Sequence, residues 1–172
     1  EVIVPSFTFI SSTTCVLLVG AKPVFVDIES DYFCIDLEQV RQALTPKTKA
    51  VIGVHLFGQP YCSELVTFCQ EHDLVLIEDA AQAHGAKQLF PDGTMRSAGA
   101  MGDIGCFSFF PSKNMAVGGE GGMLTTTQSK YEDKIFGITD HGRSPDLEAI
   151  QLGSNLRMSE VSASIGLVQL SN

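Results

Sequence analysis

Apolar residues form two kinds of segment that alternate along the chain. Short continuous runs rich in Val and Ile are typical of buried strands, and segments with apolar residues three or four positions apart are typical of helices. The continuous runs predict strands at residues 2–4, 23–28, 50–56, 74–77, 105–110 and 122–126. The helical spacing predicts helices at residues 11–19, 37–44, 63–71, 130–138 and from 160 onward.

This alternation of strands and helices predicts an α/β fold. Because the strand runs are apolar throughout, we expect helices on both faces of the sheet, which indicates a mostly parallel sheet. Asp36, with Gln39 three positions later, is expected to begin the second helix as a capping box, and Ser159 is expected to cap the last helix. Residues 91–100, rich in Gly and small polar residues, are interpreted as an exposed loop.

Composition and charge narrow the range of partners. The chain has 172 residues, 44% of them apolar, which is enough for one domain with a substantial core. A net charge of -9 and a pI near 4.7 disfavour nucleic acid and anionic membranes as partners. The five cysteines form no C-x-x-C pair and have no histidines at metal-ligand spacing. We therefore expect a cytoplasmic protein without a disulfide framework or a metal site.

The candidate chemistry follows two of the predicted strands. Open parallel sheets bind ligands beyond the carboxyl ends of their strands. Residues 74–77 lead to Glu78 and Asp79, and residues 105–110 lead to Lys113, so a carboxylate and an amine are expected to face one crevice. By spacing alone, a structural ion pair or a solvated lysine in a loop is the simpler account.

Other nucleotide and metal motifs are missing from this sequence. A dinucleotide-binding domain needs G-x-G-x-x-G directly after the first strand, where residues 5–8 read PSFT. The glycines at 118–122 lack the Gly-Lys-Ser/Thr ending of a Walker loop and are interpreted as a tight turn. Four scattered histidines form no H-E-x-x-H motif and are interpreted as packing or surface residues: His55, His72, His84 and His141.

Several ordered segments resemble the DegT family of sugar aminotransferases. The central ones are IEDAAQAHG at 77–85, GDIGCFSFFPSKN at 102–114 and GGEGG at 118–122. Further similar segments are PSFTF at 5–9, GAKPVFVD at 20–27, VHLFGQP at 54–60 and NLRMSE at 155–160. Together these segments extend over nearly the whole chain.

The resemblance implies a fold-type I aminotransferase that uses pyridoxal 5'-phosphate (PLP). Lys113 would bind the cofactor through its amine and act as general acid and base, and Asp79 would keep the ring nitrogen protonated. Gln82 would approach the ring oxygen, Ser108 would bind the phosphate, and Phe9 would stack on the ring. Without the resemblance, local hydrogen bonding or core packing also explains the last three residues.

The resemblance also implies a homodimer. Asn155 matches a family asparagine that reaches across a dimer interface to the cofactor phosphate of the neighbouring subunit, and a loop-capping asparagine is the alternative. Residues 1–172 correspond to part of the large PLP-binding domain. An N-terminal segment with a phosphate-binding turn and a C-terminal small domain are expected outside them, so the segment alone is expected to be inactive.

The implied function is transamination of a keto sugar nucleotide, with an amino acid such as glutamate as donor. Two alternatives stay open: an aminotransferase for another cyclic ketone, such as an aminocyclitol precursor, and a non-catalytic regulatory homologue that keeps the PLP fold. Relatives that deoxygenate sugars carry His in place of the cofactor-binding lysine, and Lys113 argues against that chemistry.

Overall fold

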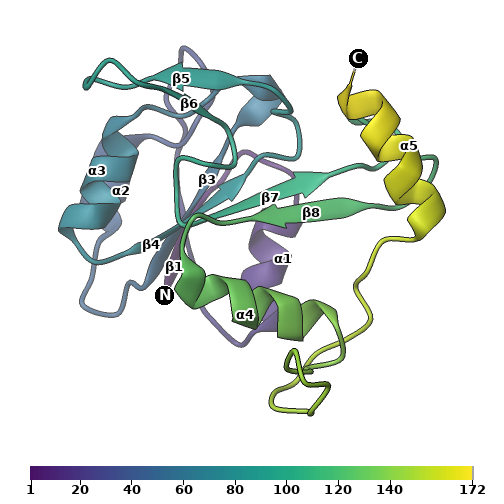
Figure 1. The fold of residues 1–172 in the computed structure, drawn as a ribbon. Coiled ribbons are helices and arrows are strands. Elements are labelled where there is room, and N and C mark those ends of the chain that lie inside the picture. Colours follow the sequence, from purple (N-terminus) through teal and green to yellow (C-terminus); the bar gives the residue numbers. More distant parts are fainter. Residues whose placement is uncertain (172) are drawn as a thin grey trace.

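The computed structural model describes residues 1–171, which form an α/β structure (Figure 1). The strands are β1 (Val2–Pro5), β2 (Pro23–Val26), β3 (Ala50–Val54), β4 (Val75–Asp79), β5 (Lys87–Leu89), β6 (Met95–Ser97), β7 (Ile104–Ser108) and β8 (Gly122–Thr125). The helices are α1 (Ser11–Leu18), α2 (Leu37–Ala43), α3 (Glu64–Glu71), α4 (Ser129–Thr139) and α5 (Glu160–Leu170), with the short 3₁₀ helix η1 (Leu56–Gly58) after β3.

The main sheet has six strands in the order β2-β1-β3-β4-β7-β8. All neighbouring pairs are parallel except β7 and β8, which are antiparallel. Since β1 lies between β2 and β3, the chain winds outward from β1 in both directions, which opens a crevice at the carboxyl ends of the strands. The prediction of a mostly parallel sheet is confirmed.

Helices cover both faces of this sheet, as predicted. Neighbouring residues of a strand point to opposite faces. Ile3 of β1 packs in a cluster with Val40 of α2 and Leu65 of α3, whereas the next residue, Val4, packs with Val16 of α1. Figure 1 shows α2 and α3 together, apart from α1. The face that carries α1 is the one on which the candidate site lies.

The predicted caps of two helices are observed. The carboxylate of Asp36 accepts hydrogen bonds from the amides of Glu38 and Gln39, and the hydroxyl of Ser159 accepts one from the amide of Ser162. The reciprocal half of the predicted capping box is not formed, because the amide of Asp36 donates to the carbonyl of Asp27 at 3.1 Å. Asp36 is therefore a simple N-cap.

The prediction of a loop at residues 91–100 is wrong in part, because β6 lies within it. β5 and β6 form an antiparallel hairpin in which Lys87 pairs with Ser97. The amide of Phe90 donates to the carbonyl of Thr94 at 2.8 Å and closes a turn around Gly93. Three-residue strands with mostly exposed side chains carry no apolar run, so the sequence pattern did not reveal them.

All five cysteines are free thiols. Within residues 1–171, no helix combines the length and the apolar character that crossing a membrane requires.

Candidate active site

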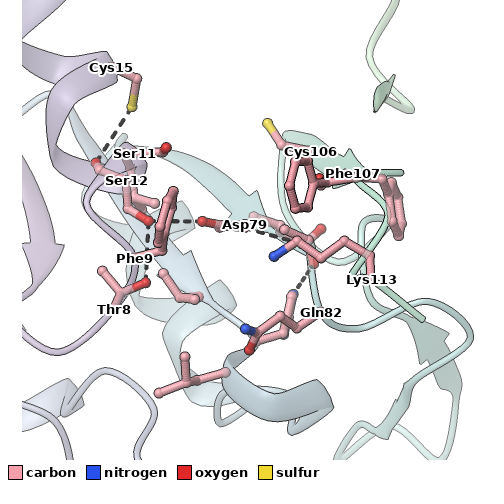
Figure 2. Close-up of a pocket in the computed structure, with 18 of the residues that line it drawn as sticks. Thr8, Phe9, Ser11, Ser12, Cys15, Asp79, Gln82, Cys106, Phe107 and Lys113 are labelled. Carbon is pink, nitrogen blue, oxygen red and sulfur yellow. Dashed lines mark hydrogen bonds and ion pairs between the residues drawn. The ribbon is translucent and has the colours of Figure 1, made fainter. Parts of the chain in front are cut away.

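A cavity of about 720 Å³ lies beyond the carboxyl ends of the central strands. Its size falls in the range of roughly 300–1,000 Å³ that is usual for small-molecule sites. Five of the six predicted site residues line it: Phe9, Asp79, Gln82, Ser108 and Lys113. Figure 2 shows several of these side chains around one space.

Asp79 and Lys113 reach this cavity from two neighbouring strands. Asp79 is the last residue of β4, which continues beyond its predicted end at Ile77. Lys113 lies in the turn after β7, where its amide donates to the carbonyl of Phe110 at 2.9 Å. β4 and β7 pair directly, with Asp79 opposite Cys106. Strand order therefore brings the carboxylate and the amine to one cavity.

The amine of Lys113 is not held in an ion pair. Among the described residues its Nζ makes neither a salt bridge nor a hydrogen bond, although Asp79 lines the same cavity. Figure 2 shows this amine directed into the space beside Gln82 and Asp79. The alternative of a structural ion pair between these two residues is therefore wrong.

The carboxylate of Asp79 is fixed by donors from two segments. Its Oδ2 accepts a hydrogen bond of 2.8 Å from the hydroxyl of Ser12 on α1, and its Oδ1 accepts one of 3.2 Å from the amide of Ala81. The hydroxyl of Thr8 lies 3.3 Å from that of Ser12. Both carboxylate oxygens are thus anchored, so the orientation of this carboxylate is fixed toward the cavity.

The amide of Gln82 is oriented by a strained turn after β3. Its Oε1 accepts a hydrogen bond of 2.7 Å from the backbone amide of Phe57. Phe57 has a φ of 56°, in the left-handed region, which costs a bulky residue of order 1–3 kcal/mol. Because the oxygen of Gln82 is occupied, its NH₂ group is the part left to donate to a ligand in the cavity.

Glu78, next to Asp79, has a different environment. It is completely buried, and its carboxylate accepts hydrogen bonds from the amides of Gly99, Met101 and Gly102 at 2.6–2.9 Å. The equally buried His55 contacts it through Nε2 at 2.8 Å. Burial acts to raise the pKa of Glu78, but the hydrogen bonds from His55 and the amides outweigh it and hold this pKa below its ordinary value.

Aromatic side chains and Ser108 complete the site. Phe9 lines the cavity and is 69% exposed, which leaves its ring available to a ligand. His84 packs against the rings of Phe107 and Phe109, and its burial, together with the positive charge of Lys113, lowers its pKa. The hydroxyl oxygen of Ser108 accepts a hydrogen bond of 3.3 Å from the amide of Phe110. Its hydrogen stays free to donate to an anion.

Asn155 is the one predicted site residue that lies outside this cavity. It forms an isolated antiparallel bridge with Asp140, and its Oδ1 accepts a hydrogen bond of 3.4 Å from the amide of Arg157. This asparagine is exposed. It is not brought to Lys113 and Asp79 within one subunit.

Sequence reasoning missed Ser12, Phe57 and the interaction of His55 with Glu78. Ser12 and Asp79 are 67 positions apart, and only the packing of α1 on the sheet brings them together. Nothing in the sequence indicates that Phe57 has a left-handed backbone conformation. One usable signal was the alternation of side chains along a strand, which puts Glu78 and Asp79 on opposite faces.

The fold of this chain is the fold of structurally characterised aminotransferases. DesV from S. venezuelae, solved in complex with a ketimine intermediate, superposes with a TM-score of 0.92 at 35% identity, over 99% of this chain and 45% of DesV. The sequence model of the DegT/DnrJ/EryC1/StrS aminotransferase family matches residues 1–172, and the chain belongs to this family. Aminotransferases of this family depend on PLP, and related structures contain the cofactor as PMP.

Two curated relatives have high identity over most of this chain. The UDP-N-acetyl-3-dehydro-alpha-D-glucosamine 3-aminotransferase of Acidithiobacillus ferrooxidans is 45% identical over 96% of this chain and 44% of its own length. A pleiotropic regulatory protein of Geobacillus stearothermophilus is 43% identical over 96% of this chain and 43% of its own length. The chain therefore spans less than half the length of these relatives.

Proposed function

We propose that the protein transfers an amino group to a keto sugar nucleotide, with PLP as cofactor and glutamate as donor. The observation that carries the proposal is the amine of Lys113, which has no ion-pair partner within residues 1–171 and shares a cavity with the anchored carboxylate of Asp79. The names of its sugar aminotransferase relatives support the substrate class.

The donors and acceptors around the cavity fit PLP. PLP has four groups that need different partners: its pyridine nitrogen, its ring oxygen, its aldehyde and its phosphate. The cavity offers them as the carboxylate of Asp79, the NH₂ of Gln82, the amine of Lys113 and the hydroxyl of Ser108. The exposed ring of Phe9 offers an apolar surface for a flat cofactor.

Each of these residues would have one task. PLP, when bound, supplies an electron sink for the carbon that loses a proton. Asp79 would accept a hydrogen bond from the protonated ring nitrogen and so favour its protonated form, because two donors hold its carboxylate in place. Lys113 would bind the cofactor covalently and, once released, move a proton with its amine.

Changing Gln82 to Glu tests the proposed role of its NH₂ group. Gln82→Glu keeps an oxygen for the amide of Phe57 but replaces the free donor with an acceptor. We expect cofactor affinity to fall by about tenfold, the value of one hydrogen bond to a charged partner. Titration of the protein with PLP measures this change. Gln88→Glu, on the hairpin strand β5, is the matched control, and equal affinities for both variants would contradict the role.

A panel of substrates tests the proposed reaction. The protein, expressed at its full natural length, would be incubated with PLP, glutamate and a series of keto sugar nucleotides, and release of 2-oxoglutarate would be measured. We expect turnover with at least one keto sugar nucleotide. Turnover only with cyclic ketones that lack a nucleotide would favour the aminocyclitol alternative, and bound PLP without any turnover would favour a regulatory homologue.

We also propose that the protein is a cytoplasmic homodimer in which Asn155 contacts the cofactor phosphate of the neighbouring subunit. The exposure of Asn155 and its absence from the cavity of its own subunit support this proposal. The complete protein would then combine residues 1–172, as part of its large domain, with further segments outside this chain.

A further inference from the structure

We propose that Ser12 is a positioning residue for Asp79 and that Thr8 assists it. The inference rests on the proposed function, because it concerns how Asp79 is prepared to bind the cofactor ring. The hydroxyl of Ser12 donates to Oδ2 of Asp79 at 2.8 Å, and Figure 2 shows Thr8, Ser12 and Asp79 joined in one chain of hydrogen bonds.

The direction of these hydrogen bonds follows from counting protons. A serine hydroxyl has one hydrogen and two acceptor lone pairs. Ser12 gives its hydrogen to Asp79, so Thr8 must be the donor in the 3.3 Å contact between the two hydroxyls. The chain therefore runs from Thr8 to Ser12 to Asp79, and each donor strengthens the next.

These hydrogen bonds fix the carboxylate of Asp79 but leave some of its acceptor positions free. Ser12 holds Oδ2, and the amide of Ala81 holds Oδ1 at 3.2 Å, so the carboxylate cannot rotate freely. Each carboxylate oxygen has about two acceptor positions, so Asp79 can still accept a hydrogen bond from a ligand in the cavity. A protonated ring nitrogen requires a carboxylate acceptor that is held in a fixed position.

The position of Ser12 is itself well determined. It is only 4% exposed and lies in the first turn of α1, whose Val16 is packed against the sheet. The amide of Ser12 donates to the carbonyl of Phe9 at 3.2 Å. One turn of chain thus carries the aromatic ring proposed to stack on the cofactor and the hydroxyl that anchors the carboxylate.

Removing the hydroxyl should weaken the hold of Asp79 on the ring nitrogen. In Ser12→Ala we expect the dissociation constant of PLP to rise by about tenfold, and the pH profile of its visible absorbance to shift. Thr8→Val removes only the second donor and should act in the same direction, by about threefold. Ser12→Thr keeps a hydroxyl and should restore most of the affinity.

The experiment uses the protein at its full natural length and PLP as the probe. Thr14→Ala is the control, because its hydroxyl lies on the same helix and, in the part of the chain that the structure describes, donates a hydrogen bond only to the carbonyl of Ser11. Failure of the wild type to bind PLP would refute the proposed function itself. Wild-type affinity and an unchanged pH profile in Ser12→Ala would overturn only the inference. If Ser12→Ala does not fold, Thr8→Val decides, and wild-type behaviour of that variant overturns the inference.

Discussion

Replacing Lys113 with alanine is expected to abolish both transamination and covalent retention of the cofactor. Since the amine would serve as attachment point and as proton carrier, kcat should fall by at least about a thousandfold. The wild type should be yellow with PLP, and borohydride should fix the cofactor to the peptide that contains Lys113. Mass spectrometry of the digested protein measures this attachment.

One further variant tests whether the amine of Lys113 or its positive charge is needed, and a second variant is the control. Lys113→Arg keeps a positive charge but offers no nucleophilic amine, so it should also lose covalent attachment. Lys47→Ala, a change of an exposed lysine outside the cavity, should behave as the wild type. Full turnover in Lys113→Ala would exclude the proposed role of this residue.

The sequence was sufficient to locate Lys113 and Asp79 but not to describe their surroundings. Both residues follow strands whose apolar runs are unmistakable, and neighbouring parallel strands deliver their carboxyl ends to one edge. Spacing alone favoured an ion pair or a solvated lysine in a loop. Among the described residues Lys113 forms no ion pair, and acceptor positions of Asp79 are occupied by Ser12 and Ala81. Such occupancy depends on the packing of α1, which no local pattern encodes.

The environments of the two neighbouring acids also depend on tertiary structure. Alternation along β4 puts Glu78 and Asp79 on opposite faces. The tertiary structure then gives each acid its environment. The loop at residues 99–102 places its amides around Glu78, and α1 places Ser12 beside Asp79. The sequence therefore predicted a carboxylate at this edge, and the fold left Asp79 open to a ligand while it buried Glu78 completely.

The buried Glu78 is expected to be a major source of stability. Glu78→Ala leaves three backbone amides without their acceptor and removes the partner of His55. Because each unsatisfied buried donor costs about 1–3 kcal/mol, we expect the free energy of unfolding to fall by about 3–5 kcal/mol. Chemical denaturation of the protein measures this loss.

Glu78→Gln keeps one oxygen acceptor in nearly the same volume and should lose about half as much stability, which provides a result if the alanine variant does not fold. Glu38→Ala is a suitable control, because this glutamate is exposed and its side chain accepts a hydrogen bond only from Gln42 among the described residues. A loss below about 1 kcal/mol in both Glu78 variants would show that the loop at residues 99–102 does not depend on this carboxylate.

The pH dependence of stability gives a second measurement of the same interaction. The pKa of Glu78 is held below its ordinary value of 4.5 in the folded protein. In the unfolded chain Glu78 should have its ordinary pKa, so the full stabilisation is present above that pKa. It is lost as the pH falls through the lower pKa of the folded protein, because the carboxylate is then protonated in both states. Glu78→Gln cannot titrate, so its stability should decline less steeply below pH 4.5 than that of the wild type. Parallel declines would mean that other groups account for the acid sensitivity.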